Sequence, residues 1–229
     1  MDEVALTKKI YAPRYVTECG AAAVAVRYML ERQDWKGAAG LQMLDFVTAP
    51  QAKALTYFGR AMGAARSGDV TAAQADIDRL KEVRAALEKA SQPYWAGQTE
   101  VQILAAQAWV AQAQGDKAEA IKFMRGAADL EDASEKHVAM ENRLYPMREL
   151  LGDMLMLQGQ EREALKEYET SLKNAPMRLR GFYGAAKAAE ASGDAKKARE
   201  YSDKLASLTK NADGDRPELA GVKRRVSSK

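Results

Sequence analysis

Apolar residues recur along this chain with the period of amphipathic helices, and a short phrase of small residues separates one helical stretch from the next. The phrase has a glycine, an acidic or amide residue directly after it, and an alanine five residues beyond the glycine. It occurs four times: Gly68-Asp69 with Ala73, Gly115-Asp116 with Ala120, Gly159-Gln160 with Ala164, and Gly193-Asp194 with Ala198. This recurrence predicts pairs of helices that stack on their neighbours in a repeat array.

Each residue type in the phrase has a physical reason. A glycine accepts the left-handed backbone that ends a helix, and the following aspartate can cap the next helix. The alanine lets two helices cross closely, where a leucine would force them apart. The glycines at 68, 115, 159 and 193 are 47, 44 and 34 residues apart. The first two helix pairs should therefore contain longer helices or an inserted segment.

The chain resembles the tetratricopeptide repeat (TPR) family, whose period is 34 residues, most closely between Leu151 and Leu205. The residues that match one repeat of the family are Leu151, Gly152, Leu155, Gly159, Ala164, Tyr168 and Pro176, and those of the next are Phe182, Ala186, Ala189, Gly193, Ala198 and Leu205. Through the segments Glu131–His137 and Pro146–Gly152 the chain is similar to the carboxyl-terminal part of bacterial TPR proteins. The resemblance implies an all-α fold, a right-handed α-solenoid of antiparallel helix pairs with a concave groove.

We therefore expect one TPR-like solenoid over residues 1–229. Its predicted parts are a degenerate repeat at 1–53, repeats at 54–99, 100–144, 145–178 and 179–210, an insertion at 131–146, and a capping helix with a tail at 211–229. The cap is expected because the last repeat of an array must cover its apolar face.

Composition narrows the classes of partner. Lys and Arg number 35 against 32 Asp and Glu, a balance that does not favour nucleic acid. No stretch has the eighteen or so apolar residues of a membrane span, and the acidic start Met1-Asp2-Glu3 is unlike a signal peptide. We expect a cytoplasmic protein with no membrane span. Cys19 is expected to be a core residue, and a reactive thiol is the alternative.

Motifs for catalysis, metals and cofactors are not evident. The one histidine, His137, excludes a histidine-pair metal site, and the acidic residues beside it are typical of a solvated loop. The glycines of Gly181-Phe182-Tyr183-Gly184 are expected inside a helix, where they cannot form a phosphate-binding loop. We expect no enzyme, no metal and no cofactor.

In the TPR arrangement the first helix of each pair lines the groove. The resemblance places these partner-binding candidates there: Phe58, Met62, Trp109, Gln112, Arg180, Tyr183 and Lys187. The groove would be aromatic in its first half, acidic in its middle and basic near its end. For Phe58, Met62 and Trp109 the alternative is packing in the core, because aromatic and methionine side chains at helical spacing usually pack there.

Two functions remain open at this point. The first is a non-catalytic interaction scaffold that binds a peptide or a partner helix in the groove. The second is a small-ligand-binding or accessory module of an enzyme, with the insertion at 131–146 as a lid. The chain could also be half of a longer array that binds nothing alone. The partner's identity and the oligomeric state are not determined by the sequence.

Overall fold

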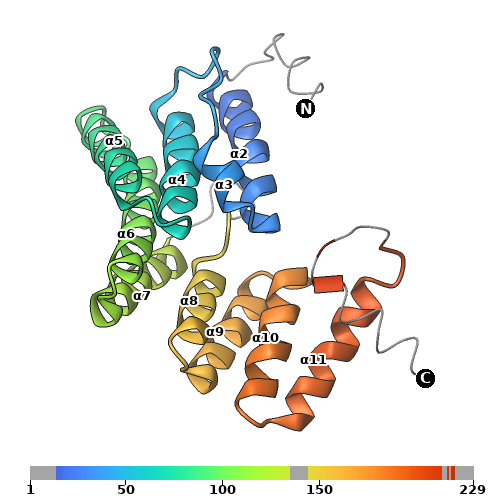
Figure 1. Cartoon of the computed structure of the whole chain (residues 1–229). Coiled ribbons are helices and arrows are strands. Elements are labelled where there is room, and N and C mark those ends of the chain that lie inside the picture. Colours follow the sequence, from blue (N-terminus) through green and yellow to red (C-terminus); the bar gives the residue numbers. More distant parts are fainter. Residues whose placement is uncertain (1–13, 135–143, 213–215, 217, 220–229) are drawn as a thin grey trace. The chain divides into compact units, whose positions relative to one another are not determined.

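The computed structural model describes residues 14–134, 144–212, 216, 218 and 219, and the regular structure within them is entirely helical (Figure 1). The all-α prediction is confirmed for this part of the chain. The helices fall into two compact units, Met1–Tyr145 and Pro146–Lys229, and each is described by itself. The boundary between them coincides with the predicted start of the third repeat. The continuity of one solenoid across this boundary stays a prediction.

The first unit contains α2 (Arg14–Arg32), α3 (Trp35–Ala39), α4 (Pro50–Arg66), α5 (Val70–Lys89), α6 (Pro93–Ala113) and α7 (Lys117–Ala133). The second contains α8 (Met147–Leu157), α9 (Glu161–Asn174), α10 (Leu179–Ala191) and α11 (Ala195–Leu208). The predicted capping helix beyond residue 211 lies almost wholly outside the described residues.

Helices pack mainly on their neighbours in the chain. In the first unit α4 lies against α2, α3, α5 and α6, while α7 packs on α6. In the second unit α8 packs on α9, α9 on α10 and α10 on α11, and α8 also contacts α10 (Figure 1). The first helix of one pair thus touches the first helix of the next pair in both units. The superhelical sense and the TPR arrangement stay predictions.

The four recurring phrases form the turns that the sequence predicts. Gly68, Gly115, Gly159 and Gly193 have φ of +87°, +85°, +73° and +81°, a left-handed conformation that suits glycine. After three of them an aspartate caps the following helix: the Asp69 carboxylate accepts from the Ala72 amide at 2.9 Å, and Asp116 and Asp194 do the same at 3.1 and 3.0 Å.

The two predicted causes of the long early spacings each account for one of them. Long helices fill the spacing from Gly68 to Gly115, whereas the spacing from Gly115 to Gly159 contains a long segment between the end of α7 at Ala133 and the start of α8 at Met147. Helices α5 and α6 have 20 and 21 residues, whereas α8 and α10 have 11 and 13. Two helices start earlier than the predicted repeats at 54 and 100, because Pro50 and Pro93 open α4 and α6. Proline suits the first turn of a helix, where its missing N–H is not needed.

The degenerate first repeat has a full first helix, α2, and a second helix, α3, of only five residues. The fully buried Glu18 of α2 joins this region to α4. Its carboxylate accepts hydrogen bonds from the backbone amides of Thr48 and Ala49 at 2.7 and 2.6 Å. These amides lie just ahead of α4, so a carboxylate from another helix supplies the cap that the sequence around Pro50 lacks.

Tyr168 shows how small residues set the spacing in the second unit. A Cβ built on Gly152 of α8 would lie 2.8 Å from the Tyr168 ring, and one built on Gly184 of α10 would lie 2.3 Å from it. The ring of this α9 residue therefore fills a slot between two glycines. Ala164, one helical turn earlier on α9, is fully buried. These contacts show that α8, α9 and α10 need small residues where they meet.

Candidate functional site

The structure corrects the predicted aromatic half of the groove. Phe58 and Met62 have no exposed surface, and Trp109 is 2% exposed, so these side chains are core and cannot meet a partner at the surface. The reason for Phe58 and Met62 is that α4 is covered by four other helices. Trp109 lies on α6, which carries apolar residues on every side and is buried accordingly.

Trp109 has a structural partner instead. The guanidinium carbon of Arg66 lies 3.8 Å from the centre of the Trp109 ring and 4.2 Å from that of the Trp35 ring. The cation from the end of α4 is therefore close to two aromatic rings, one from α3 and one from α6. Such contacts stabilise packed rings, which supports a role for Trp109 in holding α3, α4 and α6 together.

The other candidates differ in exposure. Gln112 and Tyr183 are partly exposed, and Lys187 is exposed with its ammonium 3.3 Å from Glu190. Arg180 is only 6% exposed, so the expectation that it projects freely into a groove is wrong. Its burial has a specific cause, because carboxylates from two other parts of the second unit surround its guanidinium.

These charges form one cluster on α8 and the start of α10. Arg178 binds both carboxylate oxygens of Glu149: Nε donates to Oε1 at 2.7 Å, and Nη2 donates to Oε2 at 3.0 Å. Arg180 donates from Nη2 to Asp153 Oδ2 at 3.1 Å, and the Tyr168 hydroxyl donates to Asp153 Oδ1 at 2.6 Å. The acidic middle and the basic end of the predicted groove therefore neutralise each other. We call the four residues Glu149, Asp153, Arg178 and Arg180 the charge face.

A segment near the carboxyl end of the chain completes the cluster. Arg180 Nη1 donates to Glu218 Oε1 at 3.0 Å, and Arg216 donates to the same oxygen at 3.0 Å. Glu218 is 5% exposed and Leu219 is 4% exposed. Burial alone would raise the pKa of Glu218, but hydrogen bonding and the charges of Arg216 and Arg180 outweigh it, so its pKa lies below the ordinary 4.5. Glu218 is therefore held as a carboxylate.

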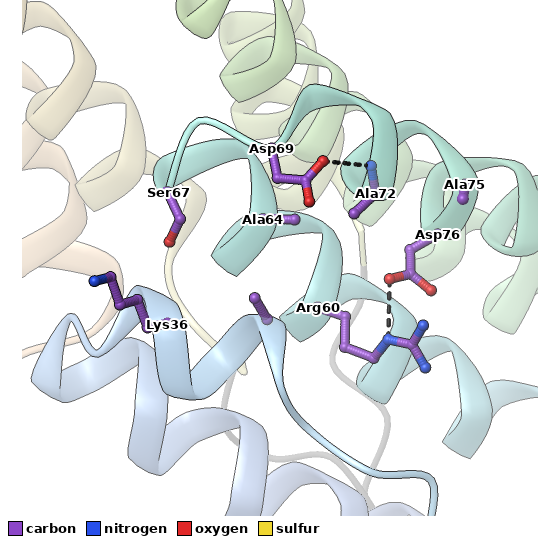
Figure 2. A pocket seen from close by; sticks show the side chains of 9 residues that line it. Lys36, Arg60, Ala64, Ser67, Asp69, Ala72, Ala75 and Asp76 are labelled. Carbon is purple, nitrogen blue, oxygen red and sulfur yellow. Dashed lines mark hydrogen bonds and ion pairs between the residues drawn. The ribbon is translucent and has the colours of Figure 1, made fainter.

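The first unit has a separate hollow of about 420 Å³ between α3, α4 and α5 (Figure 2). The small side chains that line it are those of Ala39, Ala64, Ala72 and Ala75. Its polar lining residues are Lys36, Arg60, Ser67, Asp69 and Asp76. The hollow exists because α3 and α5 both pack on α4 and lie on either side of it. It was not predicted, since its polar residues come from separate helices and form no motif in the sequence.

The charges of the hollow are partly paired. Arg60 Nε donates to Asp76 Oδ2 at 3.0 Å, and Asp69 is occupied by its helix cap, as the dashed lines of Figure 2 show. Burial raises the pKa of Asp76 above its usual 3.8, because desolvation outweighs the charge and the hydrogen bond of Arg60. Lys36 is exposed and has no ion-pair partner in the part of the chain that the structure describes.

Other chemistry is limited in the described ranges. No three His, Cys, Asp or Glu side chains there gather in a way that would hold a metal ion. None of the described helices is long and apolar enough to cross a membrane. Cys19 is 2% exposed, and burial, with the nearby charge of Glu18, raises its pKa to about 12. His137 and most of the predicted lid at 131–146 lie outside the described residues.

Comparisons of the chain with family models, with curated proteins and with solved structures found no match. The TPR resemblance therefore rests on the residues of this chain alone.

Proposed function

We propose that this chain is a non-catalytic interaction scaffold, a TPR-like right-handed solenoid, that binds an extended peptide or a partner helix on the charge face. One observation carries the proposal. Arg180, on the side of α10 that the pattern assigns to the groove, binds the carboxylate of Glu218, a residue 38 positions away in an extension beyond the last complete helix pair. A surface that receives an acidic chain segment in this way is suited to receive one from another protein.

The chemistry of the face supports peptide recognition. An arginine guanidinium is planar and offers two edges, so it can bind one carboxylate from its own scaffold and a second from a ligand. Arg180 has this arrangement, with Asp153 on Nη2 and Glu218 on Nη1. Tyr183 and Lys187 follow on α10 at positions three and seven residues further, which places them on the same side of the helix. Their greater exposure leaves them available to extend the contact.

Selection from a library of displayed random peptides, with the full chain as bait, tests the proposal. We expect enriched peptides that bind the purified chain and bind the double variant Tyr183→Ala/Lys187→Glu at least about tenfold more weakly. Lys204→Ala is the matched control, because Lys204 is an exposed lysine of α11 in the same unit that contacts Glu200 and the Tyr201 ring of its own helix. Absence of any enriched sequence, or equal binding by all three proteins, would contradict the proposal.

The alternative is a small-ligand-binding or accessory module, and the hollow between α3, α4 and α5 favours it. Its volume lies within the range of ligand pockets, and both positive and negative side chains line it together with alanines. A ligand that carries both a carboxylate and an ammonium group would suit Lys36 and Asp76. Thermal-shift screening of amino acids and short peptides, repeated with Lys36→Ala, distinguishes this function, since the hollow and the charge face belong to different units.

A further inference from the structure

We infer that Arg216, Glu218 and Leu219, here called the tail segment, are an internal ligand of the charge face. The partner that replaces them carries a carboxylate side chain directly followed by an apolar residue. This inference rests on the proposed function and specifies the chemistry of the ligand at the same site.

The geometry at Arg180 separates a scaffold contact from a ligand contact. The Nη2 edge faces Asp153 of α8, which is fixed by the Tyr168 hydroxyl at 2.6 Å. The Nη1 edge faces Glu218 at 3.0 Å. The first carboxylate therefore belongs to the helical framework, and the second comes from a residue beyond the end of α11. Leu219, the next residue in the chain, is 4% exposed, so a buried apolar side chain directly follows the buried acid.

The ion pairs of α8 and α10 indicate that the tail segment can leave while those pairs stay formed. Within the helices Glu149 pairs with Arg178 and Asp153 pairs with Arg180. The tail segment also carries its own counterion, because Arg216 donates to Glu218 at 3.0 Å. Each side of the contact thus has ion pairs of its own. Separation returns Glu218 and Arg216 to water and ends the contact between Glu218 and Arg180 Nη1, while the Glu149–Arg178 and Asp153–Arg180 pairs stay formed. Breaking a buried pair is costly when it leaves one charge without a partner, and these two pairs keep theirs.

Attachment to the same chain sets a threshold for any partner. A short connection after α11 gives the tail segment an effective concentration on the order of millimolar at the charge face. A free peptide of similar chemistry must compete with this concentration, and only a ligand with further contacts, such as those at Tyr183 and Lys187, gains enough affinity. Abolishing the internal contact should therefore increase the apparent affinity of a free peptide.

The test uses the full chain, the variant Glu218→Gln/Leu219→Ser, and a synthetic peptide of residues 213–221 as the probe. Titration is followed by two-dimensional amide NMR up to several millimolar. We expect the peptide to shift the amide signals around Asp153 and Arg180 in the variant, with an apparent affinity at least about fivefold higher than for the unaltered chain. A peptide with Gln in place of Glu218 is the matched control and should bind neither protein.

The unaltered chain gives a second readout that requires no substitution. The Leu219 amide donates to the Arg216 carbonyl at 2.9 Å, and its hydrogen exchange should accelerate when the peptide displaces the tail segment. Equal peptide affinity for both proteins, or no change in Leu219 exchange at saturating peptide, overturns the inference. Library peptides that bind the full chain while Leu219 stays protected would overturn it too, but would leave the proposed function intact. If the probe binds and no library peptide does, the proposed function fails and this inference with it.

Discussion

Replacing Gly63 with alanine tests a close contact between α3 and α4 in the first unit. A Cβ built at this position of α4 would lie 2.2 Å from the Ala39 nitrogen, 2.5 Å from the Trp35 oxygen and 2.7 Å from the Ala38 carbonyl carbon. All three atoms belong to the backbone of α3, so no side-chain rotation can relieve the contact. The substitution must instead push α3 away from α4.

Two opposing effects decide the magnitude. Ordinary contacts of a Cβ begin at 3.4 Å, so α3 must move by more than 1 Å. Overpacking of this kind destabilises a protein by about 1–3 kcal/mol, whereas alanine in place of glycine inside a helix stabilises it by about 1 kcal/mol. Because rigid backbone opposes the new methyl group, we expect the upper part of the first range and a net loss of about 1–2 kcal/mol. That corresponds to a melting temperature roughly 2–8 °C lower for a chain of this size.

The assay is thermal unfolding followed by circular dichroism, with Gly97→Ala as the matched control. Gly97 lies in α6 of the same unit, and a Cβ there would meet nothing within 4 Å. The control should therefore keep only the helical gain and melt at or above the temperature of the unaltered chain. If Gly63→Ala melts with or above the control, the close contact of α3 and α4 is wrong.

Four further predictions test other parts of the chain. Ala164→Leu should lower the free energy of unfolding by about 1–3 kcal/mol in urea titration, because Ala164 is fully buried, and an unchanged midpoint would contradict the close crossing. Trp109→Ala should lower it by about 3–5 kcal/mol, and a loss below about 1 kcal/mol would show that the ring is not core. Cys19, with its pKa raised to about 12, should react with a thiol reagent at pH 8 only after unfolding, and rapid labelling of the native protein would refute its burial. The lowered pKa of Glu218 means that its contact stabilises the fold fully above about pH 4.5 and loses this contribution as the pH falls through the lowered value, so the pH dependence measured below 4.5 should shrink in Glu218→Gln.

Features that depend on a few consecutive residues could be predicted from the sequence. The left-handed turn at Gly159 and the cap formed by Asp194 need only a glycine or an aspartate at a helix boundary, and both are observed. The long distances between turn signals predicted longer helices or an inserted segment. The structure shows long helices in α5 and α6 and a long segment between α7 and α8. The starts of α4 and α6 were missed, although Pro50 and Pro93 were local signals for them.

Features that depend on distant residues could not be predicted. An amphipathic stripe shows which face of a helix is apolar, but α6 is apolar all round, and only its neighbours decide that Trp109 is buried. The pairing of Glu149 with Arg178 spans 29 residues and that of Arg180 with Glu218 spans 38, and no periodicity connects them. A sequence pattern gives the charges on each helix and not the partners they meet.

The two units use their helices differently, and the proposed function assigns the partner to the second unit for this reason. In α4 of the first unit 12 of the 17 residues are buried, and Phe58 and Met62 lie among them, so the predicted groove positions serve the fold. In the second unit the corresponding positions of α8 and α10 hold charges, which a helix pair does not need for packing. Buried ion pairs contribute little net stability compared with apolar residues of similar size, so stability alone does not account for the charge face. Its charges provide directional hydrogen bonds instead, and these are the contacts by which a surface selects one ligand over another.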